Sequence, residues 1–235
     1  MATQGTDPRR DLARIVRALR AGYGRSDAPV KRMPGRGAFR ILVATVLSTR
    51  TQDPVTAAAA ARLLAIAPDP VALARLTHRR CERIIYPVGF YRTKARMLAD
   101  LARVLVERGG VPDTIEGLLE LPGVGRKVAN IVLAKAFGQA AIAVDTHVHR
   151  ISNRLGLVRT DSPAATERRL AAVLPREYWR GWNELLVAHG QTVCRPVRPR
   201  CDECGVSRWC RQVGVRRTTP AGGRRQDRTR ATPSR

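Results

Sequence analysis

Apolar residues recur along most of this chain at the three- and four-residue spacing of an amphipathic helix. The first stripe is formed by Leu12, Ile15, Val16 and Leu19, and another starts at Met97 and is ended by Gly109 and Gly110. The same spacing predicts further helices over 38–49, 54–67, 70–77, 126–137, 146–155, 163–173 and 177–189. For the helix over 54–67, Asp53 is the expected N-cap and Pro54 the first helical residue. The runs of strand length, at 83–86 and 140–144, are isolated, so the pattern predicts an all-α fold.

The hydrophobic pattern is interrupted at 22–37 and at Gly138, and these breaks are the candidate domain boundaries. Residues 216–235 have no apolar periodicity and contain seven Arg against one Asp. This composition predicts a disordered basic tail. The tail either tethers the protein to a polyanion or has no role of its own.

The charge of the chain identifies its class of partner. Across 235 residues, 43 Lys and Arg stand against 19 Asp and Glu, a formal net charge of +24. Nucleic acid is the first candidate partner and an anionic membrane the second. Aromatic residues make up only 4%, which disfavours binding by base stacking and favours contacts to a duplex backbone. Without a visible leader or membrane span, we expect a soluble, intracellular protein.

Four of the five cysteines lie together near the C-terminus, at Cys194, Cys201, Cys204 and Cys210. In the reducing compartment that we expect, disulfides are disfavoured and a metal centre is favoured. Structural zinc usually has two close cysteine pairs, whereas the C-x6-C-x2-C-x5-C spacing has one. The spacing therefore favours a 4Fe–4S cluster, with zinc as the alternative. The remaining Cys81 is expected to be a buried, small apolar residue.

Three arginines, Arg195, Arg198 and Arg200, lie between the first two of these cysteines in a loop that two prolines stiffen. Such a loop, anchored by a metal centre, is suited to binding phosphate groups. The alternative is that the arginines only solvate the loop. The basic charge of the rest of the chain favours phosphate contact.

The sequence LPGVGRK at 121–127 predicts a tight turn between two helices. Gly123 and Gly125 allow the turn around Val124, and the second helix begins near Gly125 or Arg126. The first backbone N–H groups of that helix point outward and suit a phosphate of one DNA strand. A plain helix connection has the same pattern, so this alternative stays open.

Lys127 follows in the first turn of the second helix, where the helix dipole disfavours a cation. One interpretation is a second phosphate-binding lysine. The other is an amine nucleophile, since a lysine whose charged form is destabilised supports Schiff-base chemistry. Asp145, in the segment VDTHVHR, is either the N-cap of the next helix or an acid that takes a proton and stabilises a cation developing on a sugar.

The chain resembles the endonuclease III family in three motifs taken together, namely LPGVGRK, VDTH and the four-cysteine spacing. Members of this family are DNA glycosylases and abasic-site lyases of the helix–hairpin–helix superfamily. The resemblance covers 10–212 and implies a 4Fe–4S cluster on the four cysteines. It also implies two all-α domains, with DNA across the cleft between them and Lys127 and Asp145 on opposite walls. The implied divisions are an N-terminal segment (1–30) that packs with the cluster domain, a six-helix domain with the hairpin (31–139), the cluster domain (140–215) and the basic tail (216–235).

The resemblance further implies a bifunctional enzyme of base excision repair. Its substrates would be oxidised or ring-saturated pyrimidines in duplex DNA, flipped out of the stack before reaction. Lys127 would attack the sugar carbon, and β-elimination would then cut the strand 3′ to the abasic site, assisted by Asp145. We expect a monomer in the cytoplasm, held at the nucleoid by DNA. The alternatives are a mismatch-directed or mainly monofunctional glycosylase of this fold, and a non-catalytic DNA-binding module with a structural metal.

One segment departs from the family pattern. Members of the family commonly have Gln in the loop that fills the hole left by the flipped base, whereas Arg50 stands there in LSTRTQD. Arg donates hydrogen bonds, preferably to guanine, but accepts none, so a changed preference for the base opposite the lesion is our hypothesis. Phe90 of GFY matches the family's apolar wedge, although it is also interpretable as a core aromatic. His147 is a further expected DNA contact.

Overall fold

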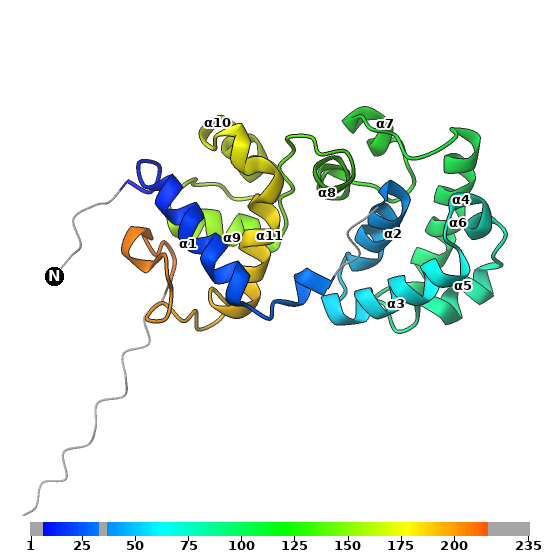
Figure 1. Ribbon diagram of the computed structural model, residues 1–235, viewed down its shortest axis with the longest axis horizontal. Helices are drawn as coiled ribbons and strands as arrows, with labels where there is room; N and C mark the ends of the chain where they lie inside the picture. Colours follow the sequence, from blue (N-terminus) through cyan, green and yellow to red (C-terminus); the bar gives the residue numbers. More distant parts are fainter. Residues whose placement is uncertain (1–6, 33–36, 216–235) are drawn as a thin grey trace, which may run out of the picture.

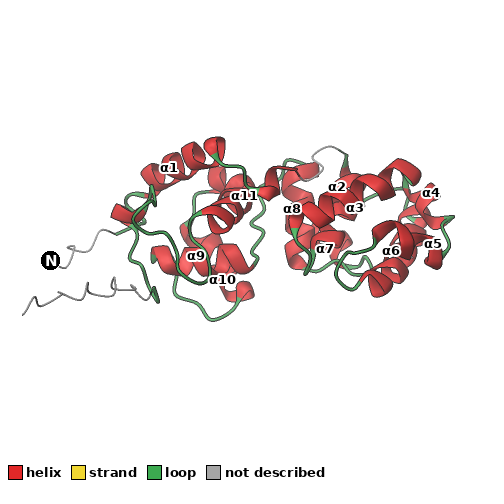
Figure 2. Ribbon diagram, turned by 90° about the horizontal axis from the view of Figure 1, so that it is seen from below, coloured by secondary structure: helices red, strands yellow, loops and turns green. Residues whose placement is uncertain are grey.

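The computed structural model describes residues 7–32 and 37–215, and within them it is built from helices and loops with no strand (Figure 2). The predicted all-α fold is confirmed. The helices are α1 (Leu12–Arg25), η1 (Pro29–Arg32), α2 (Ala38–Ser48), α3 (Asp53–Ile66), α4 (Pro70–Ala74), α5 (His78–Ile85), α6 (Tyr91–Glu107), α7 (Ile115–Leu119), α8 (Arg126–Ala136), α9 (Thr146–Leu155), α10 (Pro163–Val173), α11 (Arg176–Thr192) and η2 (Ser207–Trp209), where η marks a 3-10 turn. The predicted basic tail lies outside the described residues.

The strand-length runs do not form strands. Residues 83–85 belong to α5, whose buried face holds Cys81 and Ile85, and 140–144 form the connection from α8 to α9. Cys81 is 3% exposed within an apolar cluster, so the prediction of a buried cysteine is confirmed.

The predicted start of the helix over 54–67 is wrong by one position. The N-cap of α3 is Gln52, and Asp53 is the first helical residue, with Pro54 after it. The Asp53 carboxylate is used elsewhere, because its Oδ2 accepts a 2.6 Å hydrogen bond from Nε2 of Gln191 on α11. A tertiary partner therefore replaces the local capping bond.

The buried apolar residues form two separate cores, which correspond to the two lobes of Figure 1. One core is built from α2 to α8 and the other from α1, α9 to α11 and the cysteine-containing segment. The N-terminal helix α1 packs against α11, although most of the first core lies between them in sequence. The chain passes between the cores twice, once before α2 and once before α9.

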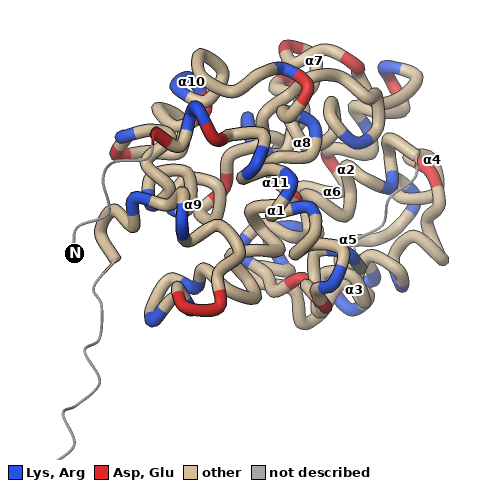
Figure 3. The backbone as a smooth tube through the Cα atoms, turned by 60° about the vertical axis from the view of Figure 1, so that its left-hand side comes forward, with Lys and Arg blue, Asp and Glu red and all other residues tan. Residues whose placement is uncertain are grey.

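Polar contacts from α8 and α3 to α10 and α11 join the two lobes. Lys135 on α8 pairs with Glu184 on α11, and Arg126 at the start of α8 pairs with Glu167 on α10. Lys and Arg are spread over both lobes (Figure 3). No helix in the described ranges is long and apolar enough to cross a membrane.

Candidate functional site

The turn between α7 and α8 is shaped by glycine. Gly123 has a φ of +74°, and a Cβ added there would lie 1.7 Å from the sulfur of Met97. Only glycine fits this combination of left-handed backbone and close packing. The next glycine, Gly125, is the N-cap of α8 and has no side chain to bond the first N–H groups of the helix. These N–H groups are therefore available to an external anion.

Two residues of the predicted DNA-binding turn already have partners inside the protein. Val124 is 6% exposed, and its N–H donates to the carbonyl oxygen of Leu121 at 3.1 Å. Val124 thus anchors the turn and offers no free donor. The exposed Arg126 guanidinium pairs with Glu167, with a distance of 3.0 Å from Nε to Oε1.

Lys127 and Asp145 line one pocket of about 500 Å³ between the lobes. Its other polar lining residues are Ser48, Asp53, Thr45, Lys135 and Asn183. Lys127 comes from the first turn of α8, and Asp145 stands immediately before α9. Within the described residues, Lys127 makes no hydrogen bond or ion pair. The two residues that the sequence singled out for chemistry thus face the same cavity.

Asp145 is the N-cap of α9, as one interpretation of the sequence predicted. Its Oδ1 accepts the N–H groups of His147 and Val148, each at 2.9 Å. These bonds fix the carboxylate at the pocket wall. The capping role and a role in the pocket are therefore compatible.

His147 is half-buried on α9. Its Nδ1 lies 3.2 Å from Nη2 of Arg150, which can only donate, so the ring proton is on Nε2. Burial lowers the pKa of His147, although the carboxylate of Asp145 opposes the shift. A contact from His147 to DNA would therefore come from a neutral N–H donor.

Arg50 and Phe90 form a pair on the surface. Phe90 is 61% exposed, which excludes the alternative of a core aromatic. The Arg50 guanidinium carbon is 5.6 Å from the centre of the Phe90 ring. Both residues have a positive φ, 53° and 58°, which is uncommon outside glycine and concentrates at functional sites.

Lys94 is a further polar residue near these loops, and it was not predicted from the sequence. It is 4% exposed, and its Nζ donates to oxygen atoms of Leu47, Thr49 and Thr51. Burial, and secondarily the charge of Lys127, lowers its pKa to about 8. The sequence does carry a signal, because Lys94 occupies the apolar stripe that continues to Leu98 on α6.

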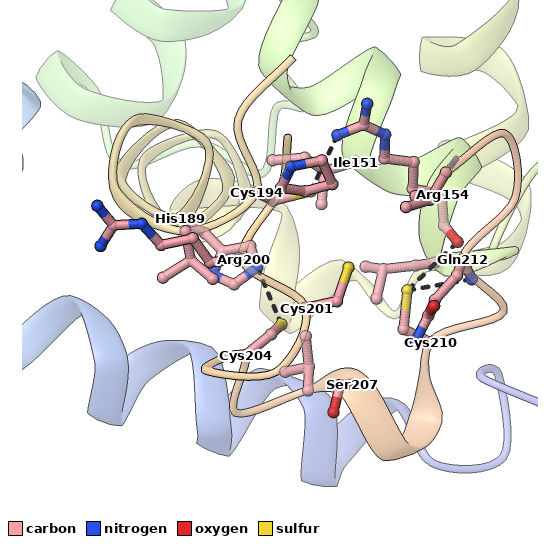
Figure 4. A pocket seen from close by; sticks show the side chains of 15 residues that line it. Ile151, Arg154, His189, Cys194, Arg200, Cys201, Cys204, Ser207, Cys210 and Gln212 are labelled. Carbon is pink, nitrogen blue, oxygen red and sulfur yellow. Dashed lines mark hydrogen bonds between the residues drawn. The ribbon is translucent and has the colours of Figure 1, made fainter. Parts of the chain in front are cut away.

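The four C-terminal cysteines line a single pocket of about 380 Å³ (Figure 4). Polar groups surround the sulfur atoms: His189 Nε2 lies 3.6 Å from Sγ of Cys204, and Arg154 Nη1 lies 3.5 Å from Sγ of Cys194. None of the described cysteines is in a disulfide. No three His, Cys, Asp or Glu side chains in the described part of the chain form a group that could hold a metal ion.

The arginine-rich loop that follows Cys194 is held from α9. The two terminal nitrogens of Arg154 donate to the carbonyl oxygens of Arg195 and Pro196, each at 2.7 Å. Arg195 and Arg198 are exposed. The exposed Arg200 has an ion-pair distance of 3.5 Å to Glu203. The loop thus presents its arginines to solvent from a fixed backbone.

Comparison with known proteins identifies related sequences. The family described as HhH-GPD superfamily base excision DNA repair protein matches residues 43–176. The chain is 46% identical over 174 residues to endonuclease III of Thermotoga maritima, a match that covers 73% of this chain and 82% of that relative.

Two solved structures with similar folds are complexes with DNA. A non-covalent endonuclease III–DNA complex has a TM-score of 0.78 and 32% sequence identity, over 87% of this chain and 95% of that one. A trapped endonuclease III–DNA covalent intermediate has a TM-score of 0.75 and 33% identity, over 85% and 95% of the two chains.

Proposed function

The chain belongs to the HhH-GPD superfamily of base excision DNA repair proteins, and from this premise we propose which residues perform its chemistry and on which lesions. It is a DNA glycosylase and abasic-site lyase that binds DNA. We propose that Lys127 is its amine nucleophile, that Asp145 assists proton transfer, and that its substrates are oxidised or ring-saturated pyrimidines. The observation that carries this proposal is the pocket that the two side chains share.

The proposed reaction starts with a nucleotide extruded from the duplex, because its sugar carbon is inaccessible inside the base stack. The neutral amine of Lys127 forms a bond to C1′ as the glycosidic bond breaks, and the base leaves with the bonding electrons and is protonated. The nitrogen on C1′ then loses a proton and the sugar ring opens at the C1′–O4′ bond, with O4′ taking a proton, which leaves a protonated imine at C1′. This imine acidifies the C2′ proton. Loss of that proton expels the 3′ phosphate, which cuts the strand by β-elimination.

Asp145 supports two steps of the proposed reaction. Its carboxylate is held at the pocket wall by two N–H groups, so it is positioned before substrate arrives. A negative charge there stabilises positive charge that develops on the sugar. It also accepts a proton from the attacking amine. Lys127 has no internal ion pair among the described residues to compete with this arrangement.

The DNA path that we propose begins at the hairpin. The uncapped first turn of α8 binds a phosphate of the damaged strand, and Arg195, Arg198 and Arg200 bind the backbone beyond it. Arg50 and Phe90 enter the space that the extruded nucleotide leaves. We also propose a monomer, located with DNA at the nucleoid.

We also propose that Cys194, Cys201, Cys204 and Cys210 hold a 4Fe–4S cluster. Four thiolates that share one zinc ion at about 2.3 Å crowd together, whereas thiolates bound to different irons of a cube are farther apart. The support for this proposal is that all four cysteines line one pocket. When bound, the cluster supplies a structural anchor and a redox-active centre. Equal iron and sulfide contents without zinc would support it, and stoichiometric zinc would overturn it.

Borohydride trapping on DNA with an abasic site tests the nucleophile. We expect wild type to form a covalent adduct and Lys127→Ala to form none, because borohydride reduces the imine. Lys135→Ala is the matched control, since Lys135 is on the same helix and lines the same pocket. An adduct retained in Lys127→Ala but absent in Lys135→Ala would transfer the role to Lys135, and no adduct with wild type would overturn the proposal.

A panel of duplexes tests the substrate class. We expect excision of ring-saturated and oxidised pyrimidines, with little excision of thymine from a mismatch with guanine. The opposite ranking would identify a mismatch-directed enzyme. Strand cleavage should accompany base release, and base release alone would identify a monofunctional glycosylase.

A further inference from the structure

Arg50 and Phe90 lie side by side although they belong to different loops. Each has a left-handed backbone, and Phe90 projects into solvent. The two side chains touch each other but are not packed into a core. Some other contact must therefore hold both backbones in this uncommon conformation.

The buried ammonium group of Lys94 makes this contact on the Arg50 side. Its Nζ donates to the carbonyl oxygens of Leu47, at 2.8 Å, and Thr49, and to the hydroxyl of Thr51 at 3.2 Å. The two carbonyls end α2, where helical partners are missing and the helix dipole favours a cation. Lys94 thus fixes both ends of the short segment that carries Arg50.

Lys94 is also joined to the loop of Phe90. Its backbone N–H donates to the carbonyl oxygen of Phe90 at 3.0 Å in the first turn of α6. The N–H of Gly89 donates to the Thr51 hydroxyl at 3.1 Å, and a Cβ at Gly89 would lie 2.5 Å from the carbonyl oxygen of Arg50. The two loops are therefore in direct backbone contact, and Thr51 bonds to both.

We propose that Lys94 is a positioning residue that joins the loops of Arg50 and Phe90 into one preassembled unit, which enters the duplex as the damaged nucleotide is extruded. This inference rests on the proposed function. Preassembly matters because both side chains must occupy the vacated space together, and ordering them only on binding would oppose extrusion. Three oxygen acceptors around a buried ammonium are suited to this task, since an apolar side chain would leave the carbonyls unpaired.

The test compares two reactions that differ in their need for extrusion. Removal of a damaged pyrimidine from a duplex requires it, whereas β-elimination at an abasic site in single-stranded DNA does not. For Lys94→Met, we expect the rate of excision from a duplex to fall about 100-fold, which is the loss that a displaced positioning group can cause. The rate of single-strand cleavage should stay near that of wild type. The single-strand reaction also shows that the variant is folded and retains its chemistry.

Thr51 provides a gentler variant in case Lys94→Met does not fold. Its hydroxyl accepts from Lys94 and Gly89 and donates to Thr49, so Thr51→Val breaks the connection and Thr51→Ser keeps it. We expect only Thr51→Val to lose duplex excision selectively. Equal losses in both reactions, or no loss in either, overturn the inference. If wild type cleaves neither substrate, the proposed function fails as well.

Discussion

Lys127 and Lys94 are each near the start of a helix, α8 and α6 respectively, and their charges are close enough to affect each other. A cation at the start of a helix opposes the helix dipole, so neither position is favourable on local grounds. Lys94 is buried and bonded to three oxygen atoms. Lys127 lines an open pocket and, within the described residues, has neither a hydrogen bond nor an ion pair.

The difference shows that partners, and not residue type, separate a structural lysine from a candidate nucleophile. All three protons of the Lys94 ammonium are used in bonds that hold a loop, so its nitrogen has no lone pair free for attack while it is charged. Lys127 has no such bonds to lose when its proton leaves. The acid expected to act with it, Asp145, lies in the same pocket.

Among the tests of the contrast between Lys127 and Lys94, replacing Asp145 has the largest expected effect. For Asp145→Asn, we expect the rate of base excision to fall by about 10²- to 10⁴-fold, because the proton acceptor and the negative charge are lost. Stability should change by less than about 0.5 kcal/mol, because Asn is an equally good N-cap. Single-turnover kinetics and urea unfolding measure the two effects. Unchanged kinetics would assign Asp145 to capping alone, and Asp145→Ala would then still lose about 1 kcal/mol.

Replacing Gly123, in the turn before Lys127, has the next largest expected effect. We expect Gly123→Ala to lower the free energy of unfolding by about 1–3 kcal/mol, because its Cβ collides with Met97 and its φ is positive. Gly125→Ala is the matched control, since no atom lies within 4 Å of a Cβ placed there. Urea unfolding of the two variants measures the difference. Equal stabilities would show that the turn before Lys127 is not rigidly packed.

Helices with continuous apolar periodicity were predictable from the sequence. The predicted spans 146–155 and 163–173 coincide with α9 and α10. By contrast, α5 was missed, because its buried residues are only Cys81 and Ile85, too few to establish a period. The capping error at Asp53 has a different cause, since its partner Gln191 lies far away in the sequence.

The candidate site was predictable where local motifs carry it. LPGVGRK and VDTH drew attention to Lys127 and Asp145, which the fold brings to one pocket. Lys94 was not predictable in the same way, because its partners come from residues 47–51 and only tertiary structure unites them. The contact of Arg50 with Phe90 was hidden for the same reason.

Arg50, on the loop that Lys94 holds, gives a smaller expected effect. We expect wild type to excise a lesion faster opposite guanine than opposite adenine, because the guanidinium bonds to guanine acceptors. For Arg50→Gln this preference should shrink by about tenfold, equivalent to about 1.4 kcal/mol of discrimination. Single-turnover excision from duplexes with each opposite base measures it. Identical profiles for the two proteins would mean that Arg50 does not read the opposite base.

The last expected effect concerns the charge of Lys94. The pKa of Lys94 is lowered to about 8 from 10.5, first by burial and then by the charge of Lys127. Between these pH values the unfolded chain binds more protons than the folded chain, so stability rises with pH. Relative to Lys94→Met, the free energy of unfolding of wild type should therefore increase as the pH is raised through this range. Urea unfolding of both proteins across the window measures the difference, with the variant as the reference that cancels all other titrations. A difference independent of pH would mean that the three oxygen acceptors fully compensate the Lys94 ammonium for its lost hydration, and that the pKa of Lys94 is not lowered by burial.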